Sequence, residues 1–246
     1  MTKLVRAPLQ EVIFEVRWQL VPDTSGKQLI DPDYQFALGP FRNMISNEFP
    51  YHVAKIPVEF PHQMLPYKLI HQFWKGENEW PVIQIGPGIM SVNDTEKNYE
   101  WEETYKPLIT KVINALVKSY PKINIIVASL RYIDVVRIED YDFNGWENFI
   151  EENFNFNFQN SFETGGTLSG IQINQSFDIA DTGILNVNFS NGKNKKNEEI
   201  FIFQSSVVKQ KAINAEDLSG WLEEAHNHTS KLFKDICKKE FYATFS

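Results

Sequence analysis

Hydrophobic and polar residues alternate over residues 10–20, which predicts a half-buried strand. The apolar positions of this run share one face: Val12, Phe14, Val16 and Trp18. Over residues 34–49 the apolar residues recur every three or four positions, so this segment is predicted to be an amphipathic helix. Three short β-like runs then predict a meander, at residues 67–74, 81–85 and 88–93. A second helical stripe covers residues 101–120.

The second half of the chain repeats this order of elements. A strand is predicted at residues 123–138 and a short helix at 146–154. Three further strands are predicted near residues 170–177, 183–189 and 198–207, and a last helix at 215–239. We therefore predict one domain, residues 1–246, made of two pseudo-repeat halves, 1–121 and 122–246.

The predicted fold class is α+β, with two β-α-β-β-β-α units in pseudo-twofold duplication. Each unit would form an antiparallel sheet with helices on one face. This architecture resembles the helix-grip, TATA-binding and GyrI-like ligand-binding folds. The resemblance implies that a ligand would bind on the helix-free face of the sheet or between the halves.

Composition and charge restrict the classes of partner. The 24 basic and 32 acidic side chains give a net charge of −8, so nucleic acid and anionic membrane surfaces are unexpected partners. No apolar run is long enough to span a bilayer. The single cysteine, Cys237, excludes an intramolecular disulfide, and the first residues lack the apolar run of a signal peptide. These features predict a cytoplasmic protein.

Motifs for catalysis, metals or cofactors are weak. His226 and His228 lie two residues apart on a predicted helix, where their side chains diverge by about 200° and cannot chelate one metal ion. Cys237 lies at the margin of the apolar stripe and is interpreted as a small core residue. We predict no catalytic residue, no metal and no cofactor.

Four residues form the predicted ligand-binding set: Arg17, Arg131, Trp221 and His226. Arg17 and Arg131 lie on the two equivalent strands, so they would grip an anion if they converged on the open face. The alternative is that each pairs with an acidic residue on a neighbouring strand. His226 is predicted to be half-buried at the edge of the apolar stripe, as a structural histidine or, alternatively, as a ligand-binding or catalytic one.

Four sequence blocks resemble a sporadically distributed family of bacterial proteins of similar length with no assigned activity. The blocks are Ala7-Pro8-Leu9-x-Glu11-Val12 with Arg17, the run from Trp80 to Gly88, Leu130-Arg131-Tyr132-Ile133, and Trp221-Leu222-x-x-Ala225-His226 with Phe233. The resemblance implies a single-domain bacterial protein encoded in accessory or mobile genes. It transfers no catalytic residue, although a counterpart of His226 recurs in the family.

Three hypotheses for function follow. The first is a non-enzymatic binding module of an accessory or defence-type locus that acts through a protein partner. The second is a sensor that binds a small or anionic molecule between the halves. The third is an enzyme that uses His226 with a carboxylate. A homodimer is compatible with each hypothesis.

Overall fold

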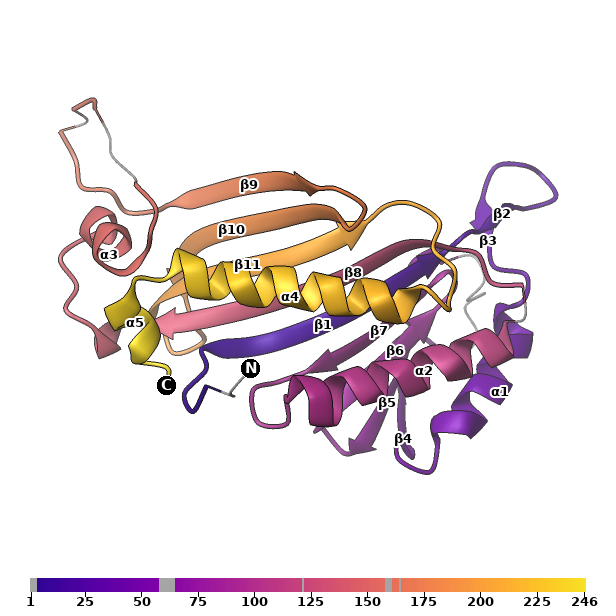
Figure 1. The fold of residues 1–246 in the computed structure, drawn as a ribbon. Coiled ribbons are helices and arrows are strands. Elements are labelled where there is room, and N and C mark those ends of the chain that lie inside the picture. The colour runs from indigo at the N-terminus through magenta and orange to yellow at the C-terminus, as the bar shows by residue number, and fades with distance from the viewer. Residues whose placement is uncertain (1–3, 58–64, 121, 158–160, 164) are drawn as a thin grey trace. The chain divides into compact units, whose positions relative to one another are not determined.

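The structure is a computed structural model that describes residues 4–57, 65–120, 122–157, 161–163 and 165–246. It is a mixed α+β fold with a large nine-stranded antiparallel sheet (Figure 1). The strands, in their order across the sheet, are β4 Tyr51–Ala54, β5 His71–Gly76, β6 Glu79–Gly86, β7 Ile89–Asp94, β1 Leu9–Trp18, β8 Ile125–Arg137, β11 Glu199–Lys209, β10 Gly183–Lys193 and β9 Gln172–Ile179. The predicted α+β class is confirmed.

Five α-helices and a small hairpin complete the described structure. The helices are α1 Tyr34–Ile45, α2 Lys106–Ser119, α3 Trp146–Asn153, α4 Leu218–Ile236 and α5 Lys239–Ala243. The hairpin pairs β2 Val21–Pro22 with β3 Leu29–Ile30, and two single turns are η2 Trp101–Tyr105 and η3 Ile138–Asp140. Sequence patterning did not predict β4 or this hairpin, because strands of two to four residues are too short to show a period.

The chain divides into two compact units whose segments interleave. Unit 1 comprises Met1–Glu11, Arg131–Val207 and Glu224–Ser246, and unit 2 comprises Val12–Leu130 and Val208–Glu223. Each unit has its own core.

The core of unit 2 is formed between the inner face of its strands and two helices. Every second residue of β1 from Val12 to Trp18 is buried, as predicted from the alternation. Figure 1 shows α1 and α2 lying side by side over one face of these strands. The buried helix residues that meet this face include Phe41 of α1 and Val112 and Leu116 of α2. Each such side chain contributes about 1.5–3 kcal/mol by leaving water.

The second helical stripe begins with a π-helical turn, η2, rather than with an α-helix. The backbone N–H of Lys106 donates to the carbonyl of Trp101, five residues earlier. Pro107 at the start of α2 explains this wider turn, because its ring would collide with the carbonyl of residue 103 in a regular α-helix. The turn remains anchored, since the Tyr105 hydroxyl donates to the Val92 carbonyl over 2.7 Å.

A buried carboxylate joins four separate segments of unit 2. Oδ2 of Asp31 accepts hydrogen bonds from Trp18 Nε1 at 2.9 Å, from the backbone N–H of Gly88 at 3.1 Å and from the Tyr120 hydroxyl at 3.2 Å. Asp31 itself is only 4% exposed. Burial and the charge of Asp31 raise the pKa of Tyr120, so this phenol stays a donor. The carboxylate thereby links the end of β1, the turn between β6 and β7, and the end of α2.

Unit 1 is packed around a cluster of aromatic rings. Neighbouring rings have centroids 5.0–6.3 Å apart, within the range of favourable ring pairs. The cluster consists of Tyr141, Trp146, Phe149, Phe154, Phe189, Phe201, Phe203, Phe233, Phe241 and Phe245. These residues come from α3, α4, α5, β10, β11 and the chain beside them, so ring packing holds the short helices in place.

The single last helix predicted over residues 215–239 is wrong in its end. Helix α4 stops at Ile236, and a separate helix α5 follows from Lys239. Between them Cys237 forms an isolated β-bridge with Phe154. The Asn155 side-chain amide donates to the carbonyls of Asp235 and Cys237, which would otherwise lack partners at the helix end. A partner 82 residues away in sequence therefore breaks the helix.

Replacing Asp31 tests the carboxylate hub of unit 2. Asp31→Ala leaves three buried donors without an acceptor, so we expect the free energy of unfolding to fall by at least about 3 kcal/mol. Urea unfolding followed by tryptophan fluorescence measures this change. Asp33→Ala is the matched control, because Asp33 is exposed and its side chain does not cap α1; it should alter stability by less than about 0.5 kcal/mol. Equal losses in both variants would contradict the hub.

Candidate functional site

Strand β9 is the edge of the sheet in unit 1. It pairs with β10 in a regular antiparallel register over all eight of its residues, from Gln172 opposite Ser190 to Ile179 opposite Gly183. Strand β9 is last in the strand order, and Figure 1 shows it as an outermost strand. Six of its eight residues are exposed. Its second side therefore presents a row of backbone groups to solvent.

The outward-pointing backbone groups of β9 can be assigned from the register. The N–H of Asn191 donates to the carbonyl of Ile171, so residue 171 belongs to a hydrogen-bonded pair with β10. In an antiparallel ladder such pairs alternate, so the odd residues of β9 bond to β10 and the even ones point away from it. The N–H and C=O groups that point outward are those of Gln172, Asn174, Ser176 and Asp178.

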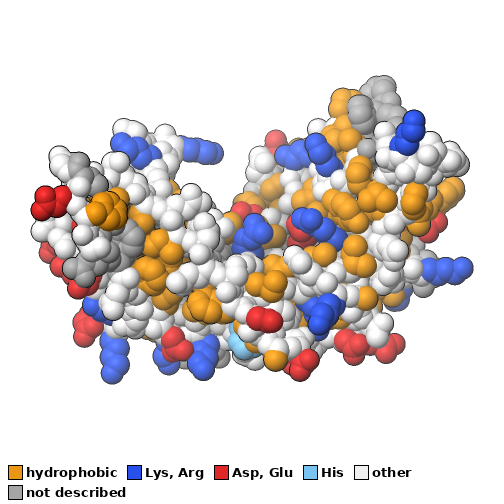
Figure 2. Space-filling model, turned by 90° about the horizontal axis from the view of Figure 1, so that it is seen from above, with side chains coloured by type: hydrophobic (Ala, Val, Ile, Leu, Met, Phe, Trp, Pro, Cys, Tyr) orange, Lys and Arg blue, Asp and Glu red, His pale blue; other side chains and the backbone are white. Residues whose placement is uncertain are grey.

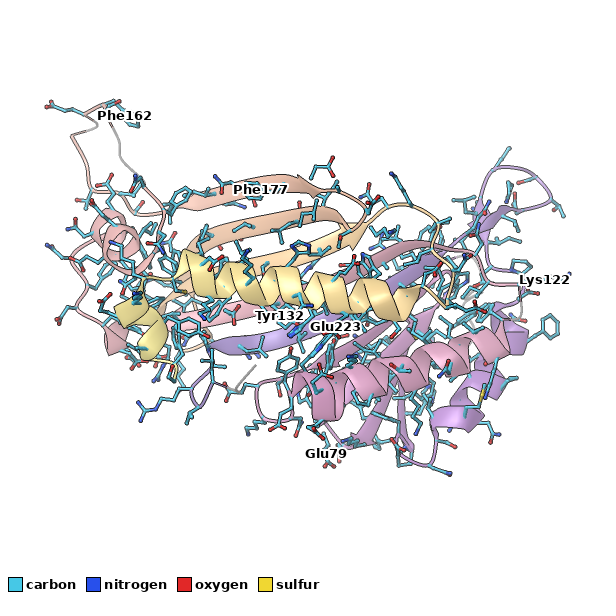
Figure 3. All side chains as sticks on the ribbon, viewed as in Figure 1. Glu79, Lys122, Tyr132, Phe162, Phe177 and Glu223 are labelled. Atoms are coloured by element: carbon cyan, nitrogen blue, oxygen red, sulfur yellow. The ribbon has the colours of Figure 1, made fainter. Side chains whose placement is uncertain are left out.

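The side chains of β9 do not protect this edge. Proteins usually blunt an exposed edge with lysine, proline, a bulge or a very short strand. Strand β9 has none of these, and Asp178 is its one charged residue. Phe177 is 47% exposed on the same strand (Figure 3). By contrast, β4 at the other end of the strand order has four residues and is flanked by Pro50 and Lys55.

The two faces of β9 differ in character. Ile173, Gln175 and Phe177 lie opposite Phe189, Val187 and Leu185 of β10, which are buried in the aromatic core. On the other face, Ser176 donates to Asn186 and Asn188 donates to Asn174. The apolar face of unit 1 thus extends to its edge strand, β9, where some apolar side chains remain partly exposed. Sequence alternation predicted this strand but not its edge position.

Arg17 lies on the face of β1 opposite the buried residues of that strand. Its Nε is 2.8 Å from Oε1 of Glu15, and its guanidinium carbon lies 5.8 Å from the centre of the Tyr67 ring. The side chain is 43% exposed. The expected pairing with an acidic residue is found, but the acid is two residues along the same strand rather than on a neighbouring one. Anion binding by Arg17 stays a prediction.

Arg131 lies on β8 and belongs to unit 1, whereas Arg17 belongs to unit 2. Arg131 is exposed, and within the described residues no hydrogen bond or ion pair engages its guanidinium. The convergence of the two arginines stays a prediction. Arg131 is nevertheless the member of the predicted set whose charge is available to a ligand.

Trp221 and His226 both lie on α4. Trp221 is 4% exposed and therefore a core residue rather than a surface contact. His226 is half-buried, as predicted, and its Nδ1 is 2.9 Å from the hydroxyl of Tyr132 on β8. The neighbouring Glu224 accepts a hydrogen bond from the Thr182 hydroxyl at 3.0 Å. The pair of His226 and Tyr132 joins α4 to β8 within unit 1.

Sequence reasoning did not find a row of polar side chains that crosses unit 2. Gln72 donates to Gln84 at 2.7 Å, and Gln84 donates to Ser91 and Asn93 on the next strand. The register places Gln72, Gln84, Ser91 and Glu15 directly opposite one another. These residues share the face away from α1 and α2. The sequence shows these residues as polar positions within apolar strands. It does not show that they are aligned, because the alignment depends on how the strands pair in the tertiary structure.

A second pair that the sequence did not predict joins His52 and His71. His52 Nε2 lies 2.9 Å from His71 Nδ1, across the pairing of β4 and β5. Burial, followed by the positive charge of Arg42, lowers the pKa of His52, which favours its neutral form. The two histidines are 19 residues apart in sequence, so only the strand pairing reveals the contact.

Asp134 is a buried carboxyl group on β8. Desolvation raises its pKa to about 7, and within the part of unit 1 that the structure describes it has no hydrogen-bond or ion-pair partner. Burial, with a smaller effect of the charge on Asp134, raises the pKa of the Cys237 thiol to about 12. Cys237 is 3% exposed, which confirms that it is a core residue. An activated nucleophile would instead require an accessible thiol with a lowered pKa.

The surface hollows carry mixed charge. One groove of about 660 Å³ between α1 and α2 is lined by Lys106, Lys111 and Lys118 with Glu102 and uncharged residues. Lys106 pairs with Glu223 at 2.7 Å, and Lys111 pairs with Glu48. Figure 2 likewise shows acidic and basic side chains both spread over the face drawn. The groove therefore offers no concentrated field to an anionic ligand.

Two further properties concern metals and membranes. Over the described ranges, no three His, Cys, Asp or Glu side chains are grouped so that they could hold a metal ion. No helix in the same part of the chain is long and apolar enough to cross a bilayer.

No family model, no curated protein and no solved structure matches the chain. The resemblance of the four sequence blocks to a bacterial family stays a prediction, as does the cytoplasmic location.

The raised pKa of Asp134 predicts a pH-dependent stability. The folded protein favours the neutral acid, so its stabilising effect is complete below about pH 4 and is lost as the pH rises through about 7. We expect wild-type protein to lose about 2.5 kcal/mol of unfolding free energy through this group between pH 5 and pH 8. Asp134→Asn should abolish that loss, and urea unfolding at both pH values measures it.

The control for this experiment is Asp235→Asn, because Asp235 is exposed and should leave the pH profile unchanged. If the unfolding free energy of wild type and of Asp134→Asn changed equally with pH, Asp134 would ionise in the folded protein without lowering its stability, which would contradict this prediction.

Proposed function

We propose that the chain is a non-enzymatic binding module that acts through a protein partner. The open edge of β9 carries this proposal. It presents four residues with outward N–H and C=O groups in a regular row, and β9 contains no lysine, proline or bulge to protect that row.

An extended polypeptide is the partner that fits such an edge. A strand added to a sheet gains main-chain hydrogen bonds, and its alternate side chains contact the two faces of the sheet. On one face the added strand would meet the exposed ring of Phe177 and the side chain of Ile173. On the other face it would meet the polar row that begins with Asn174 and Ser176. These contacts favour a strand with apolar residues on one side and polar residues on the other.

We also propose that the fold is an internal duplication. If the hairpin of β2 with β3 and the additional strand β4 of the first half are set aside, the order of strand, helix, three strands and helix occurs as β1, α1, β5, β6, β7 and α2, and again as β8, α3, β9, β10, β11 and α4. This repetition supports a duplication of halves 1–121 and 122–246, in an architecture like the helix-grip, TATA-binding and GyrI-like folds. The family resemblance supports a role in a bacterial accessory or defence-type locus.

Peptide display tests whether β9 binds extended partners. A phage-displayed library of ten-residue peptides is selected on the immobilised wild-type protein. Asn174→Pro removes an outward N–H without touching the ladder to β10, so we expect selected peptides to bind at least about tenfold more weakly to this variant. Asn174→Ala is the matched control, because it loses the same side chain but keeps the N–H, and it should bind normally.

Amide hydrogen exchange identifies the binding edge directly. On addition of a selected peptide, the amides of Gln172, Asn174, Ser176 and Asp178 should become protected, while the odd residues are already protected by β10. Peptides that bind Asn174→Pro and wild type equally, or protection confined to other elements, would refute binding at this edge.

A sensor for a small anionic molecule is the second candidate, and the exposed Arg131 favours it. Its guanidinium is suited to a phosphate or carboxylate group, and no described acidic residue occupies it. The third hypothesis, an enzyme that uses His226, stays a prediction; the hydroxyl of Tyr132 lies 2.9 Å from the Nδ1 of His226.

Thermal-shift measurements with inorganic phosphate, nucleotides and dicarboxylates test the sensor. A ligand at 100 times its dissociation constant stabilises the folded protein by about 2.7 kcal/mol, and Arg131→Gln should abolish that shift. Arg137→Gln is the control on the same strand, because Arg137 already pairs with Glu139 and Asp140. A shift that persists in Arg131→Gln would place the anion elsewhere, and no shift with any probe would contradict this candidate.

A further inference from the structure

We propose that the partner of the β9 edge is β9 of a second copy of this chain, paired antiparallel about a twofold axis that passes through Gln175. This inference rests on the proposed function, because it uses the same edge. It adds the identity of the partner and the register of the pairing.

The geometry of an antiparallel ladder restricts where the twofold axis can lie. Residues directly opposite each other point to the same face of a sheet. The axis must therefore lie between the two copies of one residue, so that this residue is opposite itself. An axis placed midway between two successive residues would set the apolar face of one strand against the polar face of the other. The candidates near the middle of β9 are Gln175 and Ser176.

An axis through Gln175 uses the whole open edge. Gln172 then lies opposite Asp178 of the second copy, and Asn174 lies opposite its Ser176. All of these residues have outward backbone groups, and the twofold axis repeats each pairing once. Four pairs therefore form with two hydrogen bonds each, which gives eight hydrogen bonds. An axis through Ser176 would place Gln172 opposite residue 180, which lies beyond the end of the strand. It would therefore leave part of the edge without a partner.

The side chains favour the same axis. With Gln175 on the axis, Ile173 lies opposite Phe177 twice, in pairs that are not hydrogen-bonded and whose side chains are therefore closest. This contact would cover part of Phe177, which is 47% exposed, and extend the apolar face formed by Leu185, Val187 and Phe189. An axis through Ser176 would instead oppose Phe177 with Gln175.

Charge is compatible with self-pairing. Asp178 is the one charged residue on β9, and in this register it faces the Gln172 amide of the second copy rather than another carboxylate. Like charges directly opposite one another would be destabilising. The strand is thus complementary to itself in hydrogen bonds, apolar contacts and charge.

The size of the contact predicts a reversible dimer. Seven residues of β9 from each copy, 172–178, form an interface at the small end of the range for specific complexes. We therefore expect monomer and dimer to exchange with protein concentration, and an extended foreign strand to compete with the second copy for the same edge.

Symmetric disulfide trapping tests the dimer and its register. Opposite residues in a pair without hydrogen bonds have Cα atoms about 4.5 Å apart, which suits a disulfide. Gln175→Cys in the full-length protein should therefore form a covalent dimer under mild oxidation, while wild type, whose Cys237 is buried, should not. Adding Asn174→Pro to Gln175→Cys should reduce the yield at least about tenfold. Ile184→Cys, an exposed position on β10, reports random collision.

Sedimentation equilibrium of the unmodified protein supplies an independent measurement. We expect the average mass to rise with concentration in wild type and in Asn174→Ala, and to stay that of a monomer in Asn174→Pro. Equal trapping of Gln175→Cys and Ile184→Cys, or preferred trapping of Ser176→Cys, would overturn the proposed pairing.

The failure of this inference is distinguishable from failure of the proposed function. A wild-type protein that stays monomeric but binds displayed peptides in a manner sensitive to Asn174→Pro would overturn the dimer and leave strand addition intact. A wild-type protein that stays monomeric and also binds no displayed peptide would overturn both the dimer and strand addition at β9.

Discussion

A β-sheet that does not close leaves a row of unpaired backbone hydrogen-bonding groups at each of its two edges. In this protein the strand order runs from β4 to β9, and the two edge strands differ in length and in the residues that protect them. The β4 edge is short and lies between a proline and a lysine, whereas the β9 edge is long, regular and almost uncharged. Because unpaired amide groups beside an apolar surface favour a further strand, this asymmetry determines where a partner is expected.

The two compact units are stabilised by different means. Unit 2 places one buried carboxylate, Asp31, among donors from β1, α2 and the turn between β6 and β7. Unit 1 relies on contacts between aromatic rings, with Phe154 and Phe201 near the middle of the cluster. A charged group with several donors tolerates little displacement, whereas ring contacts are distributed over many residues.

Several polar groups lie in the interior of the described part of the protein, and their neighbours are known. Asp134 lies beside a thiol whose pKa is raised to about 12, and the His226 ring contacts a phenol. The polar row from Gln72 to Asn93 consists of uncharged side chains that bond to one another. Such groups rigidify a fold when they are satisfied.

The sequence by itself determined most of the elements, because burial on one face imposes a period that is visible in the residues. The alternation of β1 and the stripe of α2 were predicted for this reason. The break of α4 at Cys237 was not, since it depends on Phe154 and Asn155.

The tertiary structure alone decided which strand lies at an edge, which side chains share a row, and which titratable groups lose water. The contact of His52 with His71, the burial of Asp134 and the open side of β9 all result from pairing between distant segments. Local periodicity records only whether a residue faces the core. It contains no information about which neighbour, if any, lies beside the strand.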